Sequence, residues 1–173
     1  MYSGRTSSFS INPSKCLMDS FIINAGIVLL TFTGMELTAY LAHRFVMHGL
    51  LWKLHEDHHR RTHTSFFERN DFFFLMFATP GILCLYVGAG SFSPVFWIGA
   101  GITLYGAAYF FIHDIFIHQR LKVMTNTKLL YFVAIRRAHK AHHKHLGKYN
   151  GENFGMLWAA PKYYAEARKL LAR

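Results

Sequence analysis

Histidines are the residues of this 173-residue chain most able to do chemistry, with twelve of them against nine acidic residues. Ten fall into four short groups. An H-x4-H pair followed by an HxxHH run occurs twice, as His43, His48, His55, His58 and His59, and again as His113, His118, His139, His142 and His143. A duplicated spacing is not typical of a solvated basic face, and it predicts metal ligands. The other two, His63 and His145, are expected at the surface, with His145 an alternative ligand.

The HxxHH runs suit a helix. Residues i, i+3 and i+4 lie within about 100° of arc on an α-helix, so the three imidazoles of each run project from one face. Two such faces predict two metal ions. An all-imidazole set suits Fe, Zn, Cu or Ni. The apolar chain beside it favours iron, because oxidising C–H bonds of a lipid-soluble substrate requires redox chemistry.

The H-x4-H pairs do not suit a straight α-helix. Five residues at about 100° each would separate the two rings by about 140°. Either the helix ends between the two histidines, which Gly49 favours for the first pair, or a π-type turn brings residues i and i+5 together.

Three carboxylates are predicted to support these ligands. Glu36 lies in an apolar segment, where a charge is costly unless it is paired or functional. It shares a helix face with His43, seven residues later. Asp57 and Asp114 each adjoin a ligand. We expect all three to accept hydrogen bonds from ligand imidazoles. The alternatives are a protonated packing residue at position 36 and surface charges at the other two.

The elements that must position these residues are apolar helices. Hydrophobic residues make up 52% of the chain and charged residues 16%, with a mean hydropathy of +0.16, whereas soluble domains carry about 25% charged residues. Three segments, at about 21–42, 72–88 and 95–113, approach the roughly 20 residues that cross a bilayer. A fourth apolar run, Leu129–Ile135, could be re-entrant or interfacial. The predicted fold class is all-α, an integral membrane bundle of three to four transmembrane helices with a cytoplasmic, histidine-rich metal-binding cap.

The chain is predicted to form one membrane domain over residues 21–173, preceded by a Ser-rich extension over residues 1–20 that is expected to be disordered. Gly99 and Gly101 in the third span would let helix backbones approach closely. The run Phe72–Phe74 is expected to face lipid or the core, with some of its rings lining an apolar substrate tunnel.

Charge predicts the orientation of the chain. The net charge is +10, and basic residues concentrate after the first and third spans, whereas the link at 88–94 is uncharged. The positive-inside rule therefore places the histidine segments in the cytoplasm. No nucleic-acid-binding motif is visible, so we expect no nucleic-acid partner. The basic surface would contact anionic lipid headgroups or an acidic electron donor.

The histidine order resembles that of the membrane fatty acid hydroxylase (sterol desaturase) superfamily of di-iron oxygenases. The sequence that flanks these histidines is similar to that of the bacterial β-carotene hydroxylases over roughly residues 36–162. The segments that carry this resemblance are AHRFVMHGLLWKLHEDHH, FIHDIFIHQR, RRAHKAHHKHLG and ENFGMLW.

The resemblance implies a non-haem di-iron centre held by the ten histidines, with O2 as co-substrate and electrons from a donor such as ferredoxin and its reductase. It implies 3-hydroxylation of the β-ionone rings of β-carotene, through β-cryptoxanthin to zeaxanthin, as part of carotenoid biosynthesis. The expected location is the bacterial inner membrane, among lipid. Zinc could replace iron on purification.

Two other functions stay open at this point. The histidine pattern alone also permits a membrane hydroxylase or desaturase of fatty acids or sterols. A non-enzymatic membrane metal transporter or a bis-histidine haem protein is a further alternative. Transport predicts polar ligands deep within the spans, whereas these histidines cluster at span ends, and haem would leave eight histidines unexplained.

Overall fold

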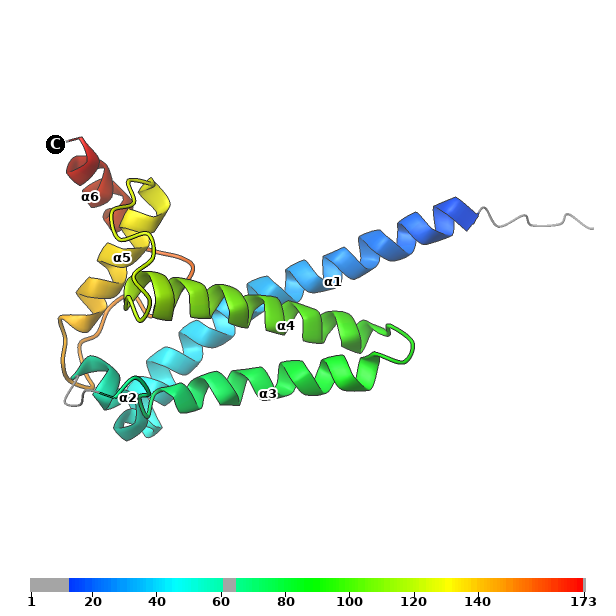
Figure 1. Ribbon diagram of the computed structural model, residues 1–173, viewed down its shortest axis with the longest axis horizontal. Helices are drawn as coiled ribbons and strands as arrows, with labels where there is room; N and C mark the ends of the chain where they lie inside the picture. The colour runs from blue at the N-terminus through cyan, green and yellow to red at the C-terminus, as the bar shows by residue number, and fades with distance from the viewer. Residues whose placement is uncertain (1–12, 61–64, 173) are drawn as a thin grey trace, which may run out of the picture.

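The computed structural model describes residues 13–60 and 65–172 (Figure 1). Within these ranges every regular element is a helix, which confirms the all-α prediction. In chain order the elements are α1 (Pro13–Leu41), the π-helix η1 (Ala42–Leu50), α2 (Trp52–His59), α3 (Asp71–Gly88), α4 (Pro94–Phe110), the π-helix η2 (Phe111–Ile117), α5 (Leu130–His143) and α6 (Pro161–Leu171).

Within the described residues, three helical stretches are long and apolar enough to cross a membrane, as predicted. They cover Leu17–Leu50, Asp71–Gly88 and Pro94–Ile117. The expected disordered extension is wrong for residues 13–20, because α1 already begins at Pro13. Proline suits the first position of a helix, where its fixed φ is helical and its missing N–H is not needed. Residues 1–12 lie outside the described residues.

The fourth apolar run does not become a fourth span in the described parts of the chain. It opens α5, whose 14 residues are too few to cross a bilayer. The buried residues of α5 recur on one face, so that face packs against the rest of the protein. They are Ala134, Ile135, Ala138, His139 and His142.

The second and third spans, α3 and α4, form an antiparallel hairpin, and α1 crosses α4 and then leaves it towards its own N-terminal end (Figure 1). Glycines allow these close contacts. A Cβ on Gly99 would lie 2.6 Å from the backbone nitrogen of Leu85 on α3, and one on Gly101 would lie 2.6 Å from the Cβ of Thr31 on α1. The predicted close approach of helix backbones is therefore confirmed.

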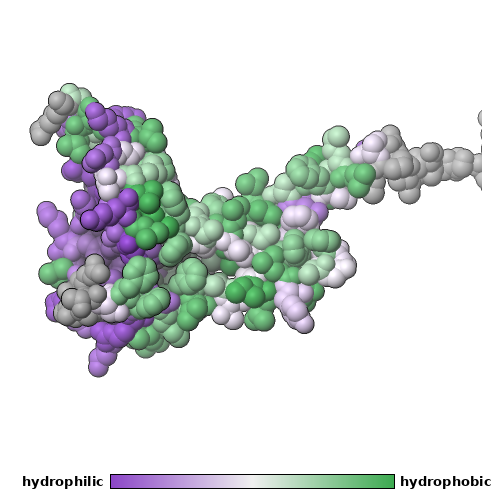
Figure 2. Space-filling model, in the orientation of Figure 1, coloured by the Kyte–Doolittle hydropathy of each residue, from purple (hydrophilic) through white to green (hydrophobic). Residues whose placement is uncertain are grey.

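Hydrophilic side chains gather at one end of the molecule, and apolar ones cover the spans (Figure 2). We call that end the cap; it comprises η1, α2, η2, α5, α6 and the segments that connect them. A small apolar core lies between η2, α5 and α6, and alanines let these helices approach one another. Its buried members are Ile112, Phe116, Ile117, Ala134, Ile135, Ala138, Ala159, Tyr163 and Ala167.

Candidate metal centre

Both H-x4-H pairs are brought together by π-helical segments: His43 and His48 lie within η1, and His113 lies within η2, which His118 caps. The backbone N–H of His118 donates to the carbonyl of His113 (2.9 Å), and that of Leu51 donates to the carbonyl of Val46 (2.8 Å), which are i→i−5 bonds. As a result the two rings of each pair are neighbours, with centroids 5.2 Å apart in the first pair and 4.6 Å apart in the second. The π-turn alternative therefore holds for both pairs. Just after the first pair, the non-helical dihedral angles of Gly49 also kink the helix.

The ten histidines gather into two adjacent groups in the cap. The first group comprises His43, His48, His55, His59 and His142, whose candidate ligand atoms all lie within 4.8 Å of one another. The second group comprises His58, His113, His118 and His139, on the same criterion, and we add His143. Its ring centroid is 4.8 Å from those of His58 and His118 and 4.5 Å from that of His139, and the ring also stacks on His59 of the first group at 4.4 Å.

Each HxxHH run is divided between the two groups. On α2, His55 and His59 enter the first group and His58 enters the second; on α5, His139 and His143 enter the second and His142 the first. The three imidazoles that each run projects from one helix face therefore do not all meet the same histidine group. The reason is geometric, because i+3 and i+4 lie on opposite sides of residue i and are about 100° apart.

The inward-facing nitrogens are spaced as metal ligands are. The Nε2 atoms of neighbouring rings lie 2.9–3.2 Å apart in five pairs. Two ligands about 2.1 Å from one ion and at right angles to each other would lie about 3.0 Å apart. The pairs are His43 with His55, His55 with His59, and His48 with His142 in the first group, and His58 with His113 and His118 with His139 in the second.

The outer nitrogens of the first group all meet neutral acceptors. Four Nδ1 atoms lie 3.0–3.1 Å from backbone carbonyl oxygens of one segment, residues 145–154. The pairs are His59 with His145, His48 with Lys148, His142 with Glu152, and His43 with Phe154. The fifth, Nδ1 of His55, lies 2.7 Å from Oδ1 of buried Asn70. An Nδ1–H that donates outward leaves the Nε2 lone pair facing inward.

Two rings of the second group meet carboxylates instead, while the buried Nδ1 of His139 has no hydrogen-bond partner among the described residues. The Nδ1 of His58 lies 2.8 Å from Oε2 of Glu68, and that of His113 lies 3.2 Å from Oδ2 of Asp114. Arg120 holds both carboxylates, with nitrogen–oxygen distances of 3.4 Å to Glu68 and 3.0 Å to Asp114, and also binds Asp71 at 2.6 Å. A charged network therefore surrounds this group on its outer side.

Burial favours the neutral form of four cap histidines, His58, His59, His139 and His142. It lowers the pKa of His59 to about 4 and that of His142 to about 3, with neighbouring imidazoles adding to the effect. The same causes lower the pKa of His58 and His139. Metal ions bind neutral imidazole, so these rings are in the protonation state that coordination requires.

The residues fit a pair of transition-metal ions. Inward lone pairs about 3 Å apart repel one another, and a cation between them removes that repulsion. In addition, the buried Nε2 of His143 has no hydrogen-bond partner, as a coordinating atom requires. The cap is therefore suited to bind metal, and the assignment of each histidine as a ligand remains our prediction.

The three predicted supporting carboxylates lie in different places. Asp114 contacts a histidine of the second group, as described above. Glu36 contacts no imidazole in the described structure, contrary to expectation. Its carboxylate accepts from the Tyr105 hydroxyl (2.7 Å) and from the backbone N–H groups of Met156 (2.9 Å) and Leu157 (3.1 Å). The face of α1 that carries Glu36 therefore points towards the segment at Met156 and Leu157, which follows the carbonyl-bearing residues 145–154 of the first histidine group.

Asp57 accepts hydrogen bonds from the backbone N–H of Arg69 (2.7 Å) and from the Nε of the same arginine (3.4 Å). It thereby holds the segment that carries Glu68 and Asn70. Those two residues and Arg120 were missed by the sequence prediction, because no spacing rule connects them to a histidine. The side chain of His145 is exposed, as predicted, and His63 lies outside the described residues.

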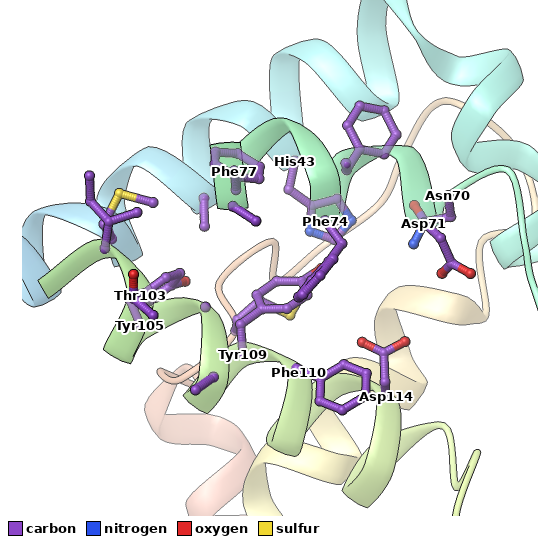
Figure 3. A pocket seen from close by; sticks show the side chains of 18 of the residues that line it. His43, Asn70, Asp71, Phe74, Phe77, Thr103, Tyr105, Tyr109, Phe110 and Asp114 are labelled. Atoms are coloured by element: carbon purple, nitrogen blue, oxygen red, sulfur yellow. The ribbon is translucent and has the colours of Figure 1, made fainter. Parts of the chain in front are cut away.

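An apolar cavity of about 350 Å³ lies between α1, α3 and α4 and reaches the first histidine group at His43 (Figure 3). Asn70, Asp71 and Asp114 lie together at one end of it, and Thr103 lies at the other. The walls between are mainly aromatic and aliphatic, with Phe73, Phe74, Phe77, Ala78, Tyr109 and Phe110 among them. The cavity thus connects the candidate metal centre with the membrane-spanning region.

Known proteins share this sequence pattern. The sequence model of the fatty acid hydroxylase family matches residues 28–160. A beta-carotene hydroxylase of Pantoea ananas is 41% identical over 141 residues, which cover 82% of this chain and 80% of that protein. One of Paracoccus sp. (strain PC1) is 38% identical over 136 residues, 78% of this chain and 83% of that protein.

A chloroplastic beta-carotene 3-hydroxylase of an Oncidium hybrid cultivar is 40% identical over 149 residues, 84% of this chain and 47% of that longer protein. No solved structure matches. The match to the family extends from the first span to the start of α6 and includes all ten grouped histidines. This chain, a membrane-associated helical protein with a histidine-rich candidate metal centre, belongs to the fatty acid hydroxylase family.

Proposed function

We propose that this chain is a β-carotene 3-hydroxylase, a non-haem di-iron monooxygenase that converts β-carotene through β-cryptoxanthin to zeaxanthin. The names of its bacterial and plant relatives support the substrate. The observation that carries the proposal is the apolar cavity that joins the membrane-spanning region to His43.

The cavity suits one end of a long apolar molecule. Its volume of about 350 Å³ lies near the lower limit for ligand pockets, about 300–1,000 Å³. A single ionone ring with the start of the polyene would fit, while the rest of the carotenoid stays in lipid. Rings of Phe73, Phe74 and Phe77 would pack against the substrate ring and exclude water. The cavity wall at His43 would bring the ring edge close to the first histidine group.

The two histidine groups would hold two iron ions, and zinc could take their place on purification. Bound iron would supply activation of O2, so that one oxygen atom enters the ring C–H bond and the other leaves as water with two electrons and two protons. The protein's own part is to orient the histidines through their Nδ1 acceptors and to keep the cavity dry.

The electrons would come from an acidic donor such as ferredoxin with its reductase. The net charge of +10 supports this partner, because opposite charges speed association. The same charge supports placement of the cap on the cytoplasmic side of the bacterial inner membrane, beside anionic lipid headgroups. Most of the described chain would then act as a single membrane domain.

The test is expression of the chain in a bacterium engineered to accumulate β-carotene, followed by chromatography of the extracted pigments. We expect β-cryptoxanthin and zeaxanthin, and their loss in a His139→Ala variant that is produced in equal amount. Absence of any new polar carotenoid would overturn the proposed substrate. Hydroxylated or newly unsaturated fatty acids or sterols in the same extracts would reassign the chain to another substrate class of its family.

A further inference from the structure

The two histidine groups differ in the charge of the atoms that support them. In the first group every Nδ1 meets an uncharged acceptor, either a backbone carbonyl of residues 145–154 or the amide oxygen of Asn70. In the second group the Nδ1 atoms of His58 and His113 meet carboxylates. The otherwise similar sets of five imidazoles are therefore not equivalent.

The negative charge beside the second group is not cancelled by its own cation. Arg120 lies within 3.4 Å of three carboxylates, those of Glu68, Asp71 and Asp114. The side chains of Glu68, Asp114 and Arg120 are only 10–13% exposed, so solvent screens their charges weakly. One guanidinium against three carboxylates leaves a net negative field at the second group.

Two cations lie beside the supporting segment of the first group, but both are exposed to solvent and one is paired. The Nε of Arg60 donates to the carbonyl of Leu146 (2.8 Å) while its guanidinium pairs with Glu56 (3.6 Å), and the guanidinium of Arg44 lies 6.0 Å from the centre of the Phe154 ring. The buried carboxylates of the second group are the less screened charges, and nearby negative charge favours a bound cation. A carboxylate that accepts from a ligand imidazole also makes that ligand more basic.

We propose that the two metal sites have unequal affinities: the second group binds its ion more tightly and fills first, and the first group binds its ion more weakly. Among the described histidines His43 alone lines the substrate cavity, so the weaker site contributes a ligand to its wall, whereas the tighter site reaches the wall through the carboxylates Asp71 and Asp114. Glu68 acts here as a positioning residue through His58. This inference rests on the two-metal centre proposed above, and it does not depend on the substrate.

The test is titration of metal-free, full-length protein in detergent micelles with Co²⁺ against a competing chelator, followed by absorption spectroscopy. We expect two resolved steps of one equivalent each. The Glu68→Gln variant keeps an oxygen acceptor for His58 and removes only the charge. It should weaken the tighter step about 10- to 100-fold and change its spectrum, while the weaker step keeps both its affinity and its spectrum.

Asn70→Ala provides the reciprocal variant, because it removes the acceptor of His55 and should weaken only the second, looser step. Glu166→Gln is the matched control, since Glu166 pairs with Arg137 on the surface of the cap and contacts no histidine of either group; it should leave both steps unchanged. ⁵⁷Fe-loaded protein should give two Mössbauer doublets, of which Glu68→Gln shifts one.

Binding of both ions in a single step by the unmodified protein would overturn the inequality. So would a Glu68→Gln variant that weakens both steps equally, because that result would indicate a general structural effect. Failure to produce hydroxylated carotenoid, with two unequal Co²⁺ steps retained, would overturn the proposed substrate alone. Binding of fewer than two ions would overturn the metal centre and this inference together.

Discussion

At the scale of single residues, Glu36 acts on the histidines indirectly. Its carboxylate fastens the backbone of Met156 and Leu157 to α1 and accepts from Tyr105 on α4. The segment just before Met156 supplies four of the carbonyl oxygens that orient the first histidine group. Glu36 therefore anchors one end of the segment that orients these rings.

Replacement of Glu36 by alanine should lower metal occupancy, mainly at the first histidine group. The change leaves two backbone N–H groups and one hydroxyl without their acceptor, and hydrogen bonds to a charged group each contribute about 1.5–3 kcal/mol. Glu36→Gln keeps an oxygen for the backbone N–H groups and should lose less. Metal analysis and thermal unfolding of the purified variants check this.

Tyr105→Phe is the control for Glu36, since it removes the hydroxyl contact and keeps the contacts to the returning segment. We expect metal occupancy close to that of the unmodified protein. Full occupancy in Glu36→Ala would contradict the anchoring role.

The candidate metal-binding histidines could be predicted from the sequence, but most of the side chains that support them could not. A repeated histidine spacing is visible along the chain, and Asp114 was found because it adjoins His113. Glu68, Asn70 and Arg120 come from connecting segments whose path depends on the folded cap. Nothing local in the sequence relates them to an imidazole.

At the scale of elements, the position of α1 against α4 depends on glycine. A Cβ on Gly101 would lie 2.6 Å from the Cβ of Thr31 and 2.9 Å from the carbonyl oxygen of Val28, so there is no room for a side chain. This contact matters for the site, because α1 carries Glu36 and continues into the π-helix that bears His43.

Gly101→Ala should therefore destabilise the protein in detergent by about 1–3 kcal/mol, the usual cost of overpacking. Gly34→Ala on α1 is the matched control, since a Cβ there meets nothing within 4 Å. It should leave stability unchanged or raise it by up to about 1 kcal/mol, because alanine favours a helix. Equal unfolding temperatures for the two variants would contradict the close helix contact.

The cavity between α1, α3 and α4 gives a second prediction at this scale. Ala78→Phe places a ring in the cavity and should reduce hydroxylation roughly 10- to 100-fold, because a displaced substrate ring reacts poorly, while metal content stays unchanged. Leu75→Phe on the same helix is the control, since Leu75 is 62% exposed and does not line the cavity. Pigment analysis and metal analysis separate the two effects. Normal turnover in Ala78→Phe would contradict the assignment of the cavity to the substrate.

At the scale of the whole molecule, the three candidate spans of the described chain predict that the cap and the link between α3 and α4 lie on opposite sides of the bilayer. The polar end and the apolar body of the protein follow the same division (Figure 2). The concentration of basic residues in the cap makes the cytoplasm the expected side for it.

Single-cysteine labelling should report this orientation. In a chain whose Cys16 and Cys84 are replaced by serine, Ser91→Cys should react with a membrane-impermeant thiol reagent in spheroplasts. Lys144→Cys on the cap should react only after the membrane is permeabilised. Labelling of both positions from the same side would contradict a three-span topology, and the reverse pattern would invert the orientation.

Hydropathy, helical periodicity and residue spacing are local properties that can be read along the chain. The sequence by itself therefore determined the all-α class, the three candidate spans and which ten histidines are candidate ligands. It also restricted the H-x4-H pairs to two geometries. Only the tertiary structure decided which histidines share a group. Because i+3 and i+4 diverge around a helix, each HxxHH run contributes to both groups, and the packing of α2 against α5 and the π-helices determines which ring faces which. The same packing supplies the carbonyl and carboxylate acceptors that make the two groups unequal.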